Sequence, residues 1–419
     1  MDFQIFAAEL FQNWAYYIPI LLLFAGGYLL IFKKQIWSIF DPLFMGALTK
    51  GCAAFAIFVL LINNFVPTKF IISFILIEVC FILGFKIKFH RGIHPRQNHA
   101  PPKYNSLTAT FGTILEIMTL LIQLYGFKTT GLVIFNEEVN HVSVYDGLGP
   151  LRAFLLGARL IFFIYFFYKR KITTLNPFDW IVFILAFIGV ISAGSKSSIL
   201  QPITIFFIVD FYFNRYTGSK IAKIKVVFLL AVISFPVAVI AIRDGGDLSK
   251  SLLLLFGRFA GTGDIYVLGY NESVMQHVSD DSFLKYVFYP GWGTILKTIG
   301  VDIVPPEGIG VNIFRQYYNT YDAGPNTRLN YLLFFFFGTA IAPIISFLFG
   351  VFIRAIREAY GKYKHRLFTF FIITILYINL LSIVSDINIF LNNTFWSIAM
   401  FLVAYISAQV VLKVKKYIV

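Results

Sequence analysis

The chain has 419 residues, of which 58% are hydrophobic, 19% aromatic and only 13% charged. Soluble domains carry about 25% charged residues, so this composition excludes an ordinary soluble globular protein, a disordered chain and a nucleic-acid binder. The formal net charge is +14, from 35 Lys and Arg against 21 Asp and Glu. The meaning of this charge depends on where the basic residues lie along the chain.

Long apolar runs recur along the whole sequence. A membrane helix needs roughly 20 mostly apolar residues, and each span must be helical because lipid offers no partner to backbone polar groups. About eleven runs are candidates: 14–32, 43–62, 68–85, 107–125, 152–168, 178–194, 198–213, 226–242, 331–352, 368–385 and 395–412. The run 198–213 is short, so 178–213 is either two tilted spans or a re-entrant hairpin. We therefore expect an all-α, polytopic protein of about 11–12 transmembrane helices, the twelfth being either a span that hydropathy does not mark or a membrane segment within residues 1–13.

Basic residues gather in alternate loops, which gives the orientation. They follow the first, third, fifth, seventh and ninth runs and close the chain, for example at Lys33 and Lys34 and throughout 86–103. By the positive-inside rule these loops are cytoplasmic. The C-terminus then lies inside and, with eleven spans, the N-terminus lies outside. The net charge is mainly a signal of topology and of contact with anionic lipid headgroups.

One long segment between spans divides the chain into three parts. We expect membrane helices in 1–242, a large external loop in 243–330 and membrane helices again in 331–419. Loops of this length are usually functional. Its apolar and aromatic runs predict short helices lying along the membrane surface.

Four arginines stand out in this otherwise acidic loop. Arginine presents a planar, permanently charged fork that binds phosphate through two hydrogen bonds. The loop therefore offers candidate ligands for a membrane-bound diphosphate: Arg243, Arg258, Arg315 and Arg328. A second external point is the turn 194–198, Gly-Ser-Lys-Ser-Ser, where Lys196 and the hydroxyls can donate to an anion. Each arginine can equally pair with a nearby acid or a lipid phosphate, and 194–198 can be a tight turn with a snorkelling lysine.

Charged residues also lie inside the predicted spans. Glu78, Glu116 and Arg159 are each near the middle of a run, where isolated charges are costly and usually pair or line a cavity. We expect Arg159 to pair with one of these glutamates, or the three to line a polar path. Lys50 is expected to snorkel towards the cytoplasmic face. No metal site is predicted, because the two cysteines lie in apolar runs and most histidines lie in basic cytoplasmic loops.

Three short elements carry a family resemblance. They are the turn 194–198, the Phe-Gly-Arg-Phe at 256–259, and the Gly-Pro-Asn at 324–326 followed by Phe337-Gly338 and Pro343. Together with the layout of spans, they resemble the Wzy-type O-antigen polymerases, which join oligosaccharide repeat units. The related O-antigen ligases often carry a His-Asn pair before the corresponding span, whereas this chain reads Asn-Thr-Arg at 326–328. The resemblance therefore favours a polymerase over a ligase.

The resemblance implies a glycosyltransferase of GT-C-like fold in the bacterial inner membrane. Its substrates would be undecaprenyl-diphosphate-linked oligosaccharides at the external leaflet, and a chain-length regulator protein would be a further partner. Fixed arginines can stabilise a diphosphate leaving group without a metal, so no cofactor is expected. The acceptor hydroxyl must lose a proton, for which the base candidates are Asp264, Glu272 and His277. Tyrosines of the loop could stack on sugar rings: Tyr266, Tyr270, Tyr317, Tyr318 and Tyr321.

The chief alternative function is transport of a lipid-linked oligosaccharide. A flippase would share the size, the number of spans and the basic loops. Transporters usually show two related halves with binding residues near the midplane. No such halves are evident in the sequence, and a transporter does not need a long external loop.

Overall fold

The computed structural model describes most of the chain, and every regular element in it is a helix. The described residues are 3–88, 104–131, 148–192, 200–214, 256–257, 259–278, 282–301, 304, 306–318, 324–360, 367–380 and 382–418. Within these ranges, eight helices are long and apolar enough to cross a membrane. The chain is therefore an all-helical protein with the features of a multi-pass membrane protein.

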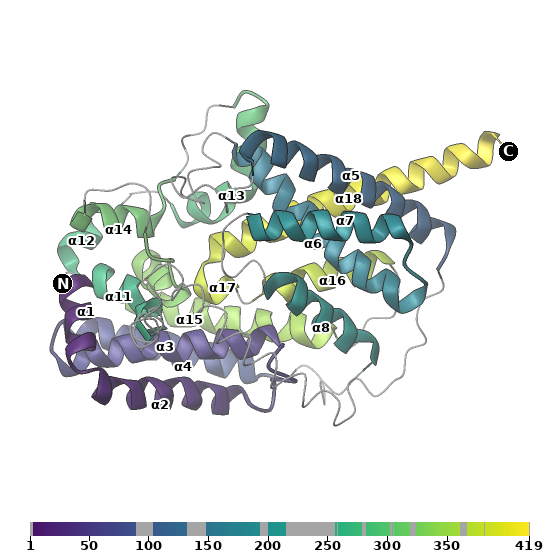
Figure 1. Cartoon of the computed structure of the whole chain (residues 1–419). Coiled ribbons are helices and arrows are strands. Elements are labelled where there is room, and N and C mark those ends of the chain that lie inside the picture. The colour runs from purple at the N-terminus through teal and green to yellow at the C-terminus, as the bar shows by residue number, and fades with distance from the viewer. Residues whose placement is uncertain are drawn as a thin grey trace.

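The helices form two groups that lie side by side in Figure 1. The first group contains α1 (Phe3–Gln12), α2 (Trp14–Phe32), α3 (Pro42–Ile62), α4 (Thr68–Lys86), α11 (Asp264–Gly269), α12 (Glu272–His277), α14 (Ile309–Tyr318) and α15 (Leu329–Tyr360). The second contains α5 (Ser106–Thr130), α6 (Gly149–Ile172), α7 (Pro177–Ser192), α8 (Leu200–Asn214), α16 (Leu367–Asn379) and α18 (Ile387–Ile418). The short α17 (Ser382–Ser385) lies between the groups, and α13 (Phe283–Thr298) packs on α18.

The predicted spans agree well with these helices. Eight of the predicted runs coincide with the eight long apolar helices, and the runs at 178–194 and 198–213 correspond to the shorter helices α7 and α8. The run 226–242 lies outside the described residues. Helix α1 has 10 residues and packs on α11, so it is too short to supply the extra span considered for residues 1–13.

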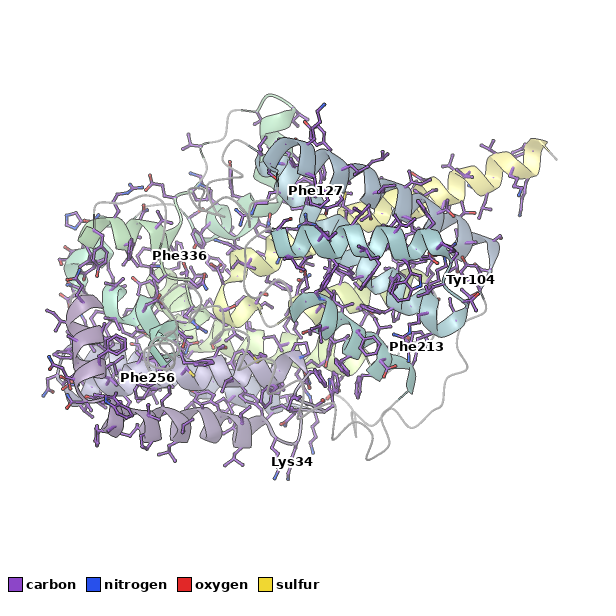
Figure 2. The ribbon with its side chains drawn as sticks, viewed as in Figure 1. Lys34, Tyr104, Phe127, Phe213, Phe256 and Phe336 are labelled. Atoms are coloured by element: carbon purple, nitrogen blue, oxygen red, sulfur yellow. The ribbon has the colours of Figure 1, made fainter. Side chains whose placement is uncertain are left out.

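Aromatic and aliphatic side chains fill the space within each group (Figure 2). Other large apolar side chains point outward from the long helices; Leu23 of α2, for example, is 72% exposed. Such exposure would be costly in water but suits contact with lipid. Among the described helices, α4 and α15 make the most extensive contact, and a Cβ on Gly84 would clash with the carbonyl oxygen of Phe347. Glycine at this position therefore allows the two backbones to touch.

Helix α15 reverses direction at Gly338, where φ is 64° and ψ is −172°. The first half, 329–337, and the second half, 339–360, both run along α4. Three hydrogen bonds to α4 show the reversal: Asn330 to Glu78, Thr339 with Ser73, and Ser346 to the carbonyl of Ile77. Residues 330 and 346 thus meet neighbouring residues of α4, although a straight helix would separate them by about 24 Å. The first half is therefore a re-entrant half-helix whose start lies inside the protein.

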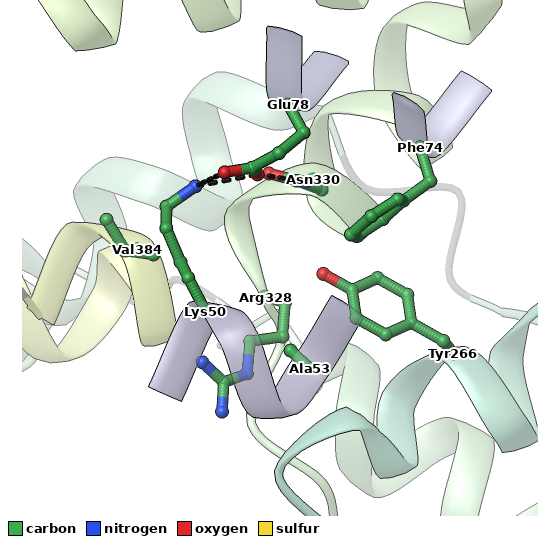
Figure 3. A pocket seen from close by; sticks show the side chains of 8 residues that line it. All are labelled: Lys50, Ala53, Phe74, Glu78, Tyr266, Arg328, Asn330 and Val384. Atoms are coloured by element: carbon green, nitrogen blue, oxygen red, sulfur yellow. Dashed lines mark hydrogen bonds and ion pairs between the residues drawn. The ribbon is translucent and has the colours of Figure 1, made fainter. Parts of the chain in front are cut away.

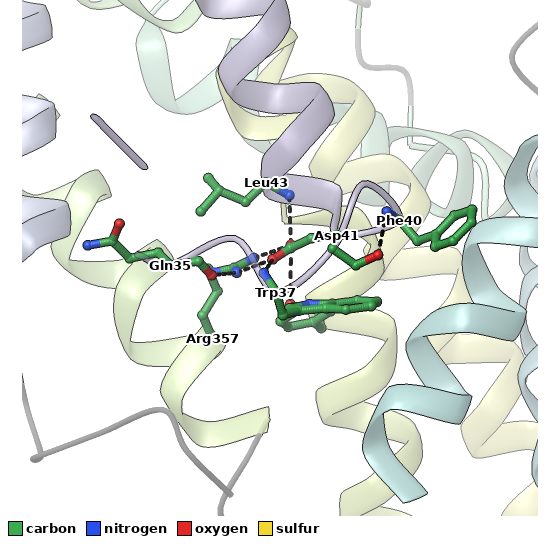
Figure 4. A network of polar contacts seen from close by, with 8 residues as sticks. Gln35, Trp37, Phe40, Asp41, Leu43 and Arg357 are labelled. Carbon is green, nitrogen blue, oxygen red and sulfur yellow. Dashed lines mark hydrogen bonds and ion pairs between the residues drawn. The ribbon is translucent and has the colours of Figure 1, made fainter. Parts of the chain in front are cut away.

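A buried ion pair connects the start of α3 to the end of α15 (Figure 4). Arg357 donates to both carboxylate oxygens of Asp41, at 2.8 and 2.7 Å. The same carboxylate accepts the backbone N–H of Leu43, so it also caps α3. Nearby, Trp37 stacks on Phe211 of α8. The linker between α2 and α3 therefore joins the two helix groups at this end of the molecule.

Candidate functional site

A polar pocket lies inside the first helix group, where α3, α4, α11, α17 and the start of α15 meet (Figure 3). Its lining combines two cations and a carboxylate with apolar walls: Lys50, Ala53, Phe74, Glu78, Tyr266, Arg328, Asn330 and Val384. The free space between these side chains is about 10 Å³, roughly the room of one water molecule, and it is partly open to the outside. Typical ligand pockets hold about 300–1,000 Å³. The lining side chains must therefore move apart before the charged head of a ligand can enter.

Lys50 and Glu78 form an ion pair on one wall of the pocket. The ammonium group of Lys50 lies 2.7 Å from each carboxylate oxygen of Glu78, and both side chains are buried. Asn330 donates from its side-chain amide to the same carboxylate, at 2.8 Å. At 1.5 Å per residue, Glu78 lies about 15 Å along α4 from Thr68, near the middle of the span. The expectation that Lys50 snorkels to the cytoplasmic face is therefore wrong, since a partner inside the protein holds it.

Arg328 brings a second cation to this pocket. Its side chain is buried, with 5% of the residue exposed, and Nε donates to the carbonyl of Thr262 at 2.9 Å. Its Nη1 atom has no hydrogen-bond partner among the described residues. A buried charged donor without an acceptor is costly. This geometry is typical of a site that an anionic ligand completes.

The backbone next to Arg328 also carries partial positive charge. Arg328 directly precedes Leu329, where the re-entrant half-helix begins. The N-terminus of a helix carries unpaired N–H groups and a partial positive charge, both of which favour anions. The reversal at Gly338 brings this N-terminus to the pocket instead of the membrane surface. Side chain and backbone therefore both favour an anion at this point.

Asp264 lies close enough to Arg328 to interact with its charge. It begins α11, is half-buried, and accepts the backbone N–H of Ile265 at 2.8 Å. Burial raises the pKa of Asp264 to about 6, and the positive charge of Arg328 opposes this rise. A carboxylate with a pKa near the working pH can accept a proton from a substrate hydroxyl. Asp264 is therefore the best-placed candidate base.

Asp386, at the turn between α17 and α18, also interacts with Arg328. Burial raises the pKa of Asp386 to about 6, while hydrogen bonds from the backbone, including that of Asn388, lower it. The charge of Arg328 lowers the pKa of both carboxyls, but burial outweighs it in each case. Sequence reasoning missed Asp386, because its proximity to Arg328 arises from packing and leaves no local pattern.

The other described site candidates lie away from the pocket. Arg315 pairs with Glu307 at 3.2 Å, and Glu272 pairs with Lys69 between two exposed side chains. His277 is exposed and contacts the carbonyl of Ser273 through Nδ1, at 2.6 Å. None of these candidates lines the pocket.

Three further candidates, Lys196, Arg243 and Arg258, lie outside the described residues, as does Tyr321. Among the tyrosines, Tyr266 lines the pocket, whereas Tyr270 is buried and stacks on Phe70. Tyr317 donates to the carbonyl of Leu268, and Tyr318 packs on Phe314. Only Tyr266 among them is both described and placed at the pocket.

A second cluster of buried charges lies in the other helix group. Lys169 of α6 contacts Asp179 at 2.6 Å and Glu116 at 3.4 Å. Arg159 donates from Nε to the side chain of Gln123 at 2.7 Å. The predicted pairing of Arg159 with a glutamate is therefore wrong, because lysines pair with both glutamates. This cluster resembles a structural network, since two carboxylates bind its lysine.

Comparisons with known proteins do not assign a function to this chain. No protein-family model matches the chain, and no curated protein or solved structure is significantly similar to it. A functional assignment therefore rests on the layout of the helices and on the chemistry of the pocket.

Proposed function

We propose that the protein is a membrane glycosyltransferase of the O-antigen polymerase type. It transfers a growing glycan from undecaprenyl diphosphate to a new lipid-linked repeat unit at the external leaflet of the bacterial inner membrane. In this proposal the fold is GT-C-like and the segment 243–330 is external. The observation that carries it is the buried guanidinium group of Arg328, with Nη1 unpaired among the described residues, at the start of a re-entrant half-helix.

The pocket and the neighbouring Asp264, which does not line it, would together supply the two functions that this reaction requires. The acceptor hydroxyl oxygen attacks the anomeric carbon of the donor glycan, and its proton passes to the carboxylate of Asp264. The bond between that carbon and the diphosphate oxygen breaks, and the electron pair leaves with the diphosphate. Arg328 and the N–H groups in the first turn of the half-helix then stabilise the charge that develops on the leaving group. The buried setting strengthens this interaction relative to water.

Transport of a lipid-linked oligosaccharide is the second candidate function. Ion pairs within the spans favour it, because buried charges near the midplane often mark translocation paths. The two functions differ in what the pocket must do. A transporter needs only to bind and release its lipid. A polymerase also needs a base, so removal of that base should abolish its activity.

A deletion strain complemented with variants distinguishes these functions. Arg328→Ala should leave single repeat units on the lipopolysaccharide, because removing one electrostatic donor typically costs about 10²–10³-fold in rate. Arg315→Ala is the matched control: it removes an arginine that does not line the pocket and should give wild-type chain lengths. Normal polymers from Arg328→Ala would contradict the proposal. Complete loss of the repeat unit from the surface would instead indicate transport or ligation.

The same variants can be compared in vitro with purified full-length protein. Lipid-linked repeat units extracted from the deletion strain serve as the only substrate, with EDTA present and without nucleotide sugars. The wild type should lengthen them and release undecaprenyl diphosphate in proportion to the bonds formed. Arg328→Lys keeps the charge but not the planar fork, so it should retain part of the rate.

A further inference from the structure

We propose that the Lys50–Glu78 pair positions Arg328 for its anionic ligand. Glu78 holds the start of the re-entrant half-helix through Asn330, and Lys50 keeps the Glu78 carboxylate from capturing the guanidinium group. This inference rests on the proposed function, because it concerns the same diphosphate-binding pocket. It assigns to Lys50 and Glu78 a role that neither the apolar spans nor the layout of the loops indicates.

The depth of the half-helix depends on Glu78. Asn330 lies two residues after Arg328, and its amide donates to Oε2 of Glu78 at 2.8 Å. This hydrogen bond joins the first turn of 329–337 to α4. The next residue, Tyr331, donates to the carbonyl of Gly269 at 3.2 Å, which ties the half-helix to α11 instead. Glu78 therefore fixes how far along α4 the chain carries Arg328 into the pocket.

Lys50 limits competition for the guanidinium group. Glu78 and Arg328 line one pocket, and a carboxylate is the strongest protein acceptor for arginine. Lys50 contacts both oxygens of Glu78, and Asn330 adds a further donor to Oε2. With three donors on this carboxylate, Glu78 does not bind Nη1 of Arg328. Lys50 thus keeps this nitrogen available for a ligand phosphate.

The phenyl ring of Phe81 holds Lys50 in this arrangement. The ammonium group lies 3.9 Å from the ring centroid, which adds a cation–π contact to the ion pair. With Glu78 on one side and an aromatic face on another, Lys50 is fixed in one direction. Its charge therefore contributes to the pocket without moving into the place of the ligand.

A rescue experiment separates positioning from simple stabilisation. Binding of undecaprenyl diphosphate to purified full-length protein in detergent is measured by isothermal titration. Lys50→Met should lower the affinity about tenfold or more, because the released Glu78 carboxylate then pairs with Arg328. The double variant Lys50→Met/Glu78→Gln should return to within about threefold of wild type, since the glutamine still accepts from Asn330 but no longer binds arginine as an anion. Asn330→Ala should lower the affinity about tenfold by releasing the half-helix.

The matched control is Lys169→Met, which breaks a buried lysine pair of the other helix group. It should reduce thermal stability as Lys50→Met does, yet leave the affinity of the folded protein unchanged. Hydrogen exchange gives a readout independent of the ligand: Asn330→Ala should speed exchange in 329–337, and Lys169→Met should not.

The outcomes distinguish the two proposals. If Arg328→Ala binds the lipid as tightly as wild type, the diphosphate site and the proposed function both fail. If Arg328→Ala loses binding while Lys50→Met and Asn330→Ala keep it, only the positioning role is overturned. Equal loss in Lys50→Met and in the double variant would also overturn it, because it would show that the lysine itself binds the ligand.

Discussion

Replacing Asp264 with asparagine should make the protein more stable at neutral pH and inactive at the same time. The pKa of Asp264 rises from 3.8 to about 6, so the folded protein holds its proton more tightly than the unfolded chain does. Stability from this group is therefore fully present below pH 3.8 and is lost as the pH rises through 6. A pKa difference of this size corresponds to roughly 3 kcal/mol, which is the upper bound of the gain in the variant at pH values well above 6.

The assay combines thermal unfolding with glycan transfer. Unfolding of wild type and Asp264→Asn is followed at about pH 5 and about pH 7.5, and the stability difference in favour of the variant should grow with pH. Transfer by the variant should fall by about 10²–10⁴-fold, the usual contribution of a general base. Wild-type transfer should itself decline as the pH falls below about 6, because the protonated carboxyl cannot accept the hydroxyl proton.

Two results would refute the assignment of Asp264 as the base. Asp264→Asn could unfold more easily than wild type at neutral pH and still make polymer, in which case the carboxylate is structural. Alternatively, Asp386→Asn could abolish transfer while Asp264→Asn leaves it intact. The base would then be the other weak acid beside Arg328.

Three further changes test the fold around the pocket. Arg357→Met leaves the buried carboxylate of Asp41 unpaired and should lower the free energy of unfolding by about 3–5 kcal/mol, which thermal unfolding can measure. The double variant with Asp41→Asn should recover stability. An unchanged unfolding midpoint in Arg357→Met would contradict the pairing. Gly84→Ala places a Cβ against the carbonyl of Phe347 and should destabilise the α4–α15 contact by about 1–3 kcal/mol in the same assay; wild-type stability would show that the two backbones are not in contact. Gly338→Ala places a side chain at φ 64° and ψ −172°, a backbone region that essentially only glycine adopts, at a cost of about 1–3 kcal/mol. It should reduce polymer length, whereas wild-type length and stability would argue against the reversal.

The spans could be predicted because the bilayer leaves the chain few choices. An apolar run of about 20 residues has one stable conformation in lipid, so length and hydropathy suffice to locate it. The same information did not reveal that α15 contains two halves of opposite direction. The run 331–352 looks continuous in hydropathy, and only the backbone at Gly338 shows where it turns.

The candidate site was predicted in part, because charge type is visible in a sequence but proximity is not. Arg328 was singled out by its chemistry, and the structure adds that it is buried and incompletely paired among the described residues. Lys50 was expected at the membrane surface, since its partner Glu78 lies on the next helix. Nothing in the sequence spacing of the two residues shows which faces of α3 and α4 point toward each other. Asn330 lies 252 residues from Glu78, a separation that no local pattern can bridge.

The two buried charge clusters explain why function is assigned to one group of helices and not to the other. In the second group, Lys169 is bound by Asp179 and Glu116, so acids surround the lysine. In the first group Lys50 and Glu78 pair with each other. Nη1 of Arg328, in contrast, has no hydrogen-bond acceptor among the described residues. Folding alone gains nothing from burying such a donor, because an apolar side chain of the same size would avoid the desolvation cost. Arg354 and Arg357 of α15 also keep a buried nitrogen without a partner among the described residues, but neither lines the pocket. An incompletely paired cation that lines a pocket is therefore the expected mark of a ligand site, and its removal should affect binding more than folding.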